Sequence, residues 1–366
     1  MAESIDSAVL QRFRITRQVG RGAYGAVFEA NPVRSPSERC AIKKCFGCFQ
    51  NITDAQRIYR EVWALMSLSH PNMVELFDVV LPSLNSQDLY LVTEYLPIDL
   101  GSAIKTSILS DHHRPFITYQ ILNGLVHMHS RDLVHRDIKP SNILLDSSCR
   151  VKLCDLGLVR FMGDSSSHLN RTDYVATRWY RAPEIMLGSN TYSFPVDIWA
   201  TGTVVAEMYL GRQLFAGTSP LNQLERIIEL TGFPSDEDLV ELGGMSRLSI
   251  LQNISKTTVV RPIAELIPNA TYTILDLLRQ MLKFSPSSRV SAQEAIRHGA
   301  FCSFTKFHPI SDIATFRMPV DVEVTNVRLS PNDYKILLCN EIENWRMHAQ
   351  KNSFSHPEHD KSITGS

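Results

Sequence analysis

The 366-residue sequence lacks any long apolar run and lacks an excess of charge of either sign. No segment is apolar for long enough to span a bilayer, and the first residues show no basic stretch followed by an apolar one. Lysine plus arginine number 37 and aspartate plus glutamate 38, so the formal charge of -1 offers no overall attraction for nucleic acid or for an acidic membrane. We therefore expect an intracellular protein with no membrane span and no nucleic-acid partner.

Cysteine is also scarce. The seven cysteines are scattered and odd in number, which is typical of a compartment where thiols stay reduced. Cys45 and Cys48 have the spacing of zinc ligands, but no second pair of cysteines or histidines accompanies them. We therefore favour an ordinary connecting segment at this position over a metal site.

The hydrophobic pattern divides the chain into two lobes. Residues 13–95 show mainly short β-rich runs separated by turn residues, with one helix predicted from Thr53 until Pro71 stops the run. After Pro97 long amphipathic helices are predicted over residues 114–130, 196–210, 221–230 and 273–282. The sequence thus predicts an α+β fold, with a β-rich lobe that carries one helix and a second lobe that is mainly helical.

These patterns also predict the segment boundaries. We expect an N-terminal segment over 1–12, the two lobes over 13–95 and 96–301, an extension over 302–347 that packs on them, and a disordered tail over 348–366. A last helix is predicted over residues 333–345.

A glycine-rich stretch lies between the first two predicted strands, with the sequence Gly20-Arg21-Gly22-Ala23-Tyr24-Gly25-Ala26-Val27. In this position it predicts a hairpin whose backbone can approach phosphates closely, because glycine carries no side chain. Taken alone, the pattern is equally typical of an ordinary glycine-rich hairpin.

A possible lysine–glutamate pair follows the glycine-rich stretch. Lys43, in Ala41-Ile42-Lys43, lies on the next predicted strand, where its long side chain can reach nucleotide phosphates. Glu61, on the predicted helix, is the candidate that orients it. A pair that closes in only one helix position would enforce an active geometry, whereas the alternative is a solvated glutamate.

The strongest signal is His135-Arg136-Asp137-Ile138-Lys139-Pro140-Ser141-Asn142, because it places a base, a cation and a metal ligand at fixed spacing. Asp137 would accept or orient the proton of an attacking hydroxyl, and Lys139 would neutralise charge on a transferred phosphoryl group. Asn142 and Asp155 would supply the hard oxygen ligands that suit Mg²⁺ bound to nucleotide phosphates.

These motifs, in this order, resemble those of the eukaryotic protein-kinase family over about residues 13–301. The resemblance implies ATP and Mg²⁺ as cofactors and transfer of the γ-phosphoryl group to protein hydroxyls. It also implies further contacts to ATP by Val27, Ala41, the gatekeeper Thr93, the hinge residues Glu94 and Leu96, and Asp99 at the ribose. Leu156 stands where the family usually has phenylalanine, and leucine can fill the same apolar slot.

The segment Thr172-Asp173-Tyr174, followed by Val-Ala-Thr-Arg-Trp-Tyr-Arg and Ala182-Pro183-Glu184, looks like the activation lip of mitogen-activated protein kinases. Phosphorylation of Thr172 and Tyr174 would each add nearly two negative charges and three acceptor oxygens. The resemblance implies arginine receptors for both phosphates: Arg60, Arg136 and Arg160 for Thr172, and Arg178 and Arg181 for Tyr174.

The resemblance further implies substrates with Ser-Pro or Thr-Pro sites and a location in the cytoplasm and nucleus. Stretches such as Pro262-Ile-Ala-Glu-Leu-Ile-Pro look most like the atypical extracellular-signal-regulated kinase 7/8 branch. That branch implies self-phosphorylation of the lip; the alternative is an upstream dual-specificity kinase, and phosphatases would reverse the modification. The acidic docking cluster usual in the group is reduced here to Asp312.

Two alternatives are less favoured. A cyclin-dependent-like kinase would lack the lip tyrosine, and a catalytically weak scaffold would have lost Lys43, Asp137 or Asp155, all of which are present. By the same resemblance Asp197 should hold the catalytic-loop backbone, and Glu184 should pair with Arg289. His127 and His129 are interpreted as packing or surface residues, since their spacing points them apart on a helix.

Overall fold

The computed structural model describes residues 4–162, 178–189, 193–242, 250–251, 254, 259–305 and 329–353. The chain divides into two compact units. The strand-rich unit comprises Met1–Ser67, Leu76–Glu94 and Val327–Ser366, and the helical unit comprises Leu68–Glu75 and Tyr95–Asn326. Among the described residues, we find no helix that is long and apolar enough to cross a membrane.

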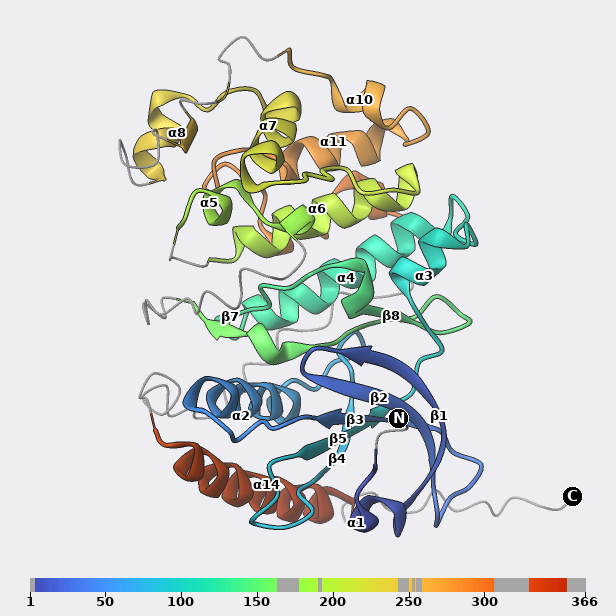
Figure 1. Ribbon diagram of the computed structural model, residues 1–366. Coiled ribbons are helices and arrows are strands. Elements are labelled where there is room, and N and C mark those ends of the chain that lie inside the picture. Colours follow the sequence, from blue (N-terminus) through green and yellow to red (C-terminus); the bar gives the residue numbers. More distant parts are fainter. Residues whose placement is uncertain are drawn as a thin grey trace, which may run out of the picture. The chain divides into compact units, whose positions relative to one another are not determined.

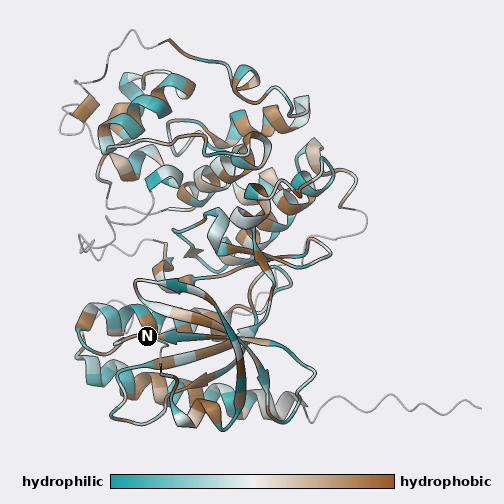
Figure 2. Ribbon diagram, turned by 45° about the vertical axis from the view of Figure 1, so that its right-hand side comes forward, coloured by the Kyte–Doolittle hydropathy of each residue, from teal (hydrophilic) through white to brown (hydrophobic). Residues whose placement is uncertain are grey.

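The strand-rich unit contains a five-stranded antiparallel sheet in the order β1-β2-β3-β5-β4. Its strands are β1 (Phe13–Gly22), β2 (Gly25–Pro32), β3 (Cys40–Cys45), β4 (Leu76–Val80) and β5 (Leu89–Glu94). Brown apolar residues follow the central strands in Figure 2, and one apolar face is covered by α1 (Ser7–Leu10), whose Val9 is fully buried. This sheet gives Lys43 a rigid support.

Two helices of the same unit lie side by side, α2 (Ile52–Ser67) and α14 (Pro331–Ser353), as Figure 1 shows. The α14 side chain Tyr334 is fully buried, and its ring centroid lies 5.7 Å from that of Tyr59 on α2. Lys335 Nζ donates hydrogen bonds to the carbonyl oxygens of Leu84, at 2.9 Å, and Ser86, at 2.5 Å. The C-terminal helix therefore supports both α2 and the loop between β4 and β5.

The helical unit is built around α4 (His113–His129) and α6 (Pro195–Leu210). Both helices are buried on nearly all sides, as expected for central helices. The α6 residue Gly202 permits a close approach, because a Cβ atom there would lie 2.9 Å from the side chain of Leu282. Around them lie α3 (Leu100–Lys105), α5 (Pro183–Met186), α7 (Pro220–Thr231), α8 (Asp236–Glu241), α10 (Ile263–Leu266), α11 (Tyr272–Met281) and α12 (Ala292–Ala295).

The helical unit also contains short strands that position its loops. They are β6 (Ile98–Asp99), β7 (Leu133–Val134), β8 (Ile143–Leu145), β9 (Val151–Leu153) and β10 (Arg160–Phe161). β6, β8 and β9 form one small sheet, and β7 pairs with β10. The predicted α+β fold is confirmed, with a strand-rich part that carries α2 and a mainly helical part.

Candidate active site

Lys43 and Glu61 form an ion pair within the strand-rich unit. Lys43 lies on β3, with Val27 on β2 and Leu91 on β5 as its register partners. Glu61 is 5% exposed, and its Oε1 atom accepts a hydrogen bond from Lys43 Nζ. The structure therefore contains the contact that the sequence predicted.

The glycine-rich stretch forms the turn between β1 and β2, where Gly22 lies opposite Gly25. Gly25 excludes any side chain, because a Cβ atom there would lie 2.2 Å from the carbonyl oxygen of Lys44. The carbonyl oxygen of Tyr24 accepts a hydrogen bond of 3.0 Å from the backbone of Phe46. The turn is thus held close against β3. The other predicted residues of this stretch lie on β1 or in its turn: Gly20, Arg21 and Ala23.

The residues predicted to border the adenine and ribose fall in both units. Ala41 and Thr93 are register partners on β3 and β5, and Glu94 ends β5. Leu96 and Asp99 belong to the helical unit. Asp99 caps α3, since its carboxylate accepts hydrogen bonds from Ser102 N at 2.9 Å and Ser102 Oγ at 2.6 Å. A carboxylate has further acceptor positions, so the cap is compatible with a ribose contact.

The structure brings together Asp137, Lys139 and Asn142 in one loop of the helical unit. Lys139 Nζ and Asn142 Nδ2 both donate to Asp137 Oδ2, at 2.6 and 2.9 Å. Because the amide nitrogen of Asn142 faces Asp137, its carbonyl oxygen points elsewhere, and it is a ligand type that Mg²⁺ prefers. The donor set of this loop therefore fits a phosphate-bound magnesium ion.

Asp197 of α6 holds the backbone of this loop. Its carboxylate accepts hydrogen bonds from His135 N at 2.9 Å and Arg136 N at 2.8 Å. Burial raises the pKa of Asp197, but the hydrogen bond and charge of His129 and the backbone N–H of Arg136 outweigh it and hold the pKa below its ordinary value. The ionised carboxylate can therefore stabilise Arg136, whose φ of 69° lies in the strained left-handed region.

His129 packs in the interior, in agreement with its interpretation as a packing residue and not as a surface residue, and it also has a partner that the sequence did not predict. Its Nε2 atom lies 2.9 Å from Asp197 Oδ2, and its ring stacks on Phe194 with centroids 4.5 Å apart. The signal that could have found this contact is Asp197, which was expected to hold the catalytic-loop backbone, because a carboxylate in the interior requires a cation or hydrogen-bond donors nearby.

Asp155 comes directly after Cys154, a residue that is hydrogen-bonded to the same loop. The backbone N–H of Cys154 donates to the backbone carbonyl oxygen of Asn142 at 3.0 Å. The next residue, Asp155, has a left-handed φ of 60°. The next residue, Leu156, is 1% exposed. Leucine thus fills an apolar position at the site where the sequence departs from the kinase pattern.

The predicted phosphate receptors occupy different elements. Arg60 lies buried on α2 in the strand-rich unit, whereas Arg136 and Arg160 lie in the helical unit, with Arg160 on β10. Arg178 begins a 3₁₀ turn, and its backbone carbonyl oxygen accepts a hydrogen bond from Arg181 N at 3.1 Å. Their proposed phosphorylated partners, Thr172 and Tyr174, lie outside the described residues, as does Asp312.

The segment after the lip is tied to the helical unit by its side chains. Trp179 Nε1 donates to Gly217 O at 3.2 Å, and Tyr180 OH donates to Glu207 Oε2 at 2.7 Å. The predicted pair of Glu184 and Arg289 is confirmed as two parallel hydrogen bonds of 2.7 Å. Arg178 and Arg181 therefore flank a well-anchored turn.

Cys45 and Cys48 are both buried. Cys48 Sγ donates to Gln87 O at 3.3 Å, and burial raises the pKa of its thiol to about 12. Cys45 ends β3 and Cys48 lies in the connection between β3 and α2, and both side chains pack in the interior of this unit.

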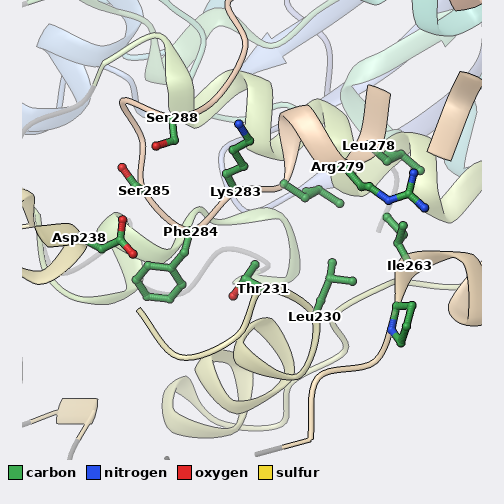
Figure 3. Close-up of a pocket in the computed structure, with 12 residues that line it drawn as sticks. Leu230, Thr231, Asp238, Ile263, Leu278, Arg279, Lys283, Phe284, Ser285 and Ser288 are labelled. Carbon is green, nitrogen blue, oxygen red and sulfur yellow. The ribbon is translucent and has the colours of Figure 1, made fainter. Parts of the chain in front are cut away.

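A separate cavity of about 430 Å³ lies within the helical unit, between α7, α8, α10 and α11 (Figure 3). Its floor is apolar, with Leu230, Ile263 and Phe284, and Arg279 and Lys283 lie on its wall. The predicted catalytic and ATP-binding residues do not line it. It therefore plays no part in the chemistry proposed below.

Comparison with known proteins gives consistent results. The model of the protein kinase domain matches residues 13–301. Extracellular signal-regulated kinase 2 of Dictyostelium discoideum is 38% identical over 347 residues, covering 93% of this chain and 92% of that protein. Mitogen-activated protein kinase 15 of Mus musculus is 44% identical over 302 residues, covering 81% of this chain and 55% of that protein.

A third relative belongs to the same group. Extracellular signal-regulated kinase 7 of Drosophila melanogaster is 38% identical over 305 residues, covering 81% of this chain and 33% of that protein. The chain thus spans nearly all of the Dictyostelium relative but about half of the mouse protein and a third of the fly protein.

Proposed function

The chain belongs to the protein kinase family and, within it, to the mitogen-activated protein kinases, and from that membership we propose that it phosphorylates serine or threonine residues that precede proline. As a serine/threonine kinase it acts on proteins. The cluster in which Asp137 contacts both Lys139 and Asn142 is the observation that supports phosphoryl transfer, whereas the proline preference rests on the family. The scaffold and cyclin-dependent alternatives are not favoured, because the relatives are mitogen-activated kinases.

The residues divide the work of phosphoryl transfer. Asp137 orients the substrate hydroxyl and accepts its proton as the oxygen attacks the γ-phosphorus, while the bond to the β–γ bridging oxygen breaks and ADP leaves. Lys139 neutralises charge on the transferred group, and Lys43, oriented by Glu61, binds the nucleotide phosphates. Asn142 and Asp155 would hold Mg²⁺, which when bound neutralises phosphate charge.

Regulation would act through Thr172 and Tyr174. We assign Arg60, Arg136 and Arg160 as receptors of phospho-Thr172, and Arg178 and Arg181 as receptors of phospho-Tyr174. The anchoring of the turn at Trp179 and Tyr180 supports a fixed receptor beside the lip. In the cytoplasm and nucleus the lip would be phosphorylated by the chain itself rather than by an upstream dual-specificity kinase, and phosphatases would reverse the modification.

A transfer assay tests the activity. Purified full-length protein with ATP and Mg²⁺ should label a Ser-Pro peptide, and Asp137→Asn should lower kcat at least about a hundredfold, the scale of general-base loss. Asp146→Asn, in a turn of the same unit, is the matched control and should keep the activity. Equal labelling by wild type and Asp137→Asn would overturn the assignment, and equal labelling of Ser-Pro and Ser-Ala peptides would remove the proline preference.

Self-phosphorylation requires a separate test. Mass spectrometry of the lip after expression of wild type and Asp137→Asn in a host without mitogen-activated kinases should find phosphate on Thr172 and Tyr174 of the wild type only. Phosphate on both proteins would indicate another kinase, and phosphate on neither would exclude self-phosphorylation under these conditions.

A further inference from the structure

Two side chains one turn apart on α2 reach two different parts of the sheet. Arg57 and Glu61 have the i, i+4 spacing that puts them on the same face of the helix. Glu61 pairs with Lys43 on β3. The guanidinium carbon of Arg57 lies 3.9 Å from the centroid of the Tyr24 ring, at the tip of the glycine-rich turn. The same helix therefore contacts both the lysine and the loop predicted to bind nucleotide.

The backbone places Tyr24 at the tip of the turn but leaves its ring free to rotate. Its carbonyl oxygen accepts the Phe46 hydrogen bond, and the absence of a side chain at Gly25 lets the turn lie against β3. The ring is 47% exposed, so hydrophobic burial alone does not determine its place. A cation over an aromatic face is attractive, and arginine is suited to it because its planar group stacks on the ring.

The proposed chemistry uses Lys43, Glu61 and the glycine-rich turn but assigns nothing to Arg57. We propose that Arg57 is a positioning residue that couples the glycine-rich turn to α2, so that nucleotide binding and the Lys43–Glu61 pair favour each other. This inference rests on the proposed function, in which the turn covers the phosphates of ATP.

The coupling follows from linkage. A glycine-rich turn loses much conformational freedom when a nucleotide orders it, and a contact that restrains its tip beforehand reduces that loss. Because Arg57 and Glu61 move with one helix, a shift of α2 that breaks the Lys43 pair also withdraws the cation from Tyr24. By reciprocity, a nucleotide that orders the turn also stabilises the position of α2 in which the pair is closed.

A double-mutant cycle tests the contact in the full-length protein, with the dissociation constant for ADP·Mg²⁺ and the KM for ATP as readouts. Arg57→Ala and Tyr24→Leu should each weaken nucleotide binding roughly two- to fivefold, the range of an exposed cation–π contact. The double variant should be no weaker than the poorer single variant, because both changes remove the same contact. KM for ATP should change more than kcat.

Matched variants separate the positioning role of Arg57 from the loss of a positive charge and from a loss of stability. Arg14→Ala removes an exposed arginine from β1 of the same unit and should leave nucleotide affinity unchanged. Arg57→Lys should restore part of the affinity, and Tyr24→Phe should preserve the coupling to Arg57, since both retain a cation over a ring. If Arg57→Ala lowers the Tm, Arg57→Gln, which keeps the aliphatic stem, replaces it in the cycle.

Fully additive effects of Arg57 and Tyr24 variants, or equal effects of Arg57→Ala and Arg14→Ala, would overturn the inference while leaving the proposed function intact. Failure of the wild type to bind ADP·Mg²⁺ would instead count against the proposed function. Coupling of Arg57 and Tyr24 together with an unchanged affinity in Arg14→Ala would establish the positioning role.

Discussion

The two units hold their predicted catalytic side chains in different ways. In the helical unit, the loop from His135 to Asn142 is fixed by Asp197, which is 1% exposed and receives hydrogen bonds from two backbone N–H groups. In the strand-rich unit, the Lys43–Glu61 pair joins a strand to a helix, and the lysine side chain is 27% exposed. The catalytic loop of the helical unit is thus held by a buried hydrogen-bond network, whereas the Lys43–Glu61 pair of the strand-rich unit depends on the position of α2.

This difference has an energetic consequence. Removing one partner of a fully buried ion pair leaves an uncompensated charge and costs about 3–5 kcal/mol. The Lys43–Glu61 pair has one buried and one partly exposed partner, so solvent screens it more and it should contribute less. The helical unit should therefore keep its loop in place whether or not ligand is bound. The strand-rich unit should respond to anything that shifts α2, including changes in its contact with α14 and in the contact of Arg57 with Tyr24.

The largest effect should come from breaking the buried network. Asp197→Ala leaves His129 and the N–H groups of His135 and Arg136 without their acceptor, so unfolding free energy should fall by about 3–5 kcal/mol, with kcat reduced at least about a hundredfold. Chemical denaturation and the peptide assay measure the two quantities.

Asp276→Ala is the matched control for this change. Asp276 also contacts a histidine, His298, at 2.9 Å, but its side chain is 41% exposed. We expect a much smaller loss of stability than for Asp197→Ala, because solvent screens an exposed pair. Equal costs for the two variants would contradict the contrast between interior and surface pairs.

A smaller stability effect should follow from loosening α14. Tyr334→Ala removes a fully buried ring from its contact with Tyr59 on α2, and the cavity should cost about 3 kcal/mol. Amide exchange along α2 should become faster, while exchange in the loop from His135 to Asn142 should stay the same. Ile336→Ala, at a residue 49% exposed on the same helix, should change stability by less than about 0.5 kcal/mol.

The last prediction concerns the pH dependence of stability and tests the interior of the helical unit. Burial lowers the pKa of His70 to about 4 and that of His127 to about 3, and their rings lie 4.5 Å apart. Both folded-state pKa values lie below the unfolded value of about 6.5, so the unfolded state binds more protons and stability is lost as pH falls below 6.5.

Since His70 is partly exposed, we expect a loss of roughly 1 kcal/mol per pH unit for each histidine rather than the full linkage value. Denaturation curves of wild type and His127→Gln between pH 7 and 5 measure this slope, which the variant should about halve. A slope that is identical in both proteins would contradict the assignment.

Local pattern accounts for what the sequence predicted well. The helix predicted over 273–282 is observed at Tyr272–Met281, because its apolar periodicity and its Thr271 cap are local signals. The helix predicted over 114–130 is observed at His113–His129, but it is buried on nearly all sides and has no side-chain cap, so its prediction as an amphipathic helix was wrong. The Lys43–Glu61 contact was predicted from the places of the two residues on a predicted strand and the helix that follows it, whereas the Glu184–Arg289 contact was predicted from the kinase resemblance.

Contacts between distant segments could not be predicted in this way. Lys335 donates to the backbone carbonyl oxygens of Leu84 and Ser86. Every residue carries a backbone carbonyl, so the sequence does not show which ones accept. The contact of Arg57 with Tyr24 likewise depends on how α2 packs against the sheet. The contact of His129 with Asp197 was not predicted, because helical spacing gives the direction of a side chain on its helix but not the carboxylate of another helix beside it.

Hydrogen–deuterium exchange of the wild type with and without ADP·Mg²⁺ tests this contrast most directly. We predict that residues 133–145 are protected in the free protein and change little, whereas residues 20–26 and 52–67 gain protection when the nucleotide binds. The opposite result, with residues 133–145 gaining the most protection and α2 unchanged, would contradict a preformed catalytic loop and an adjustable helix.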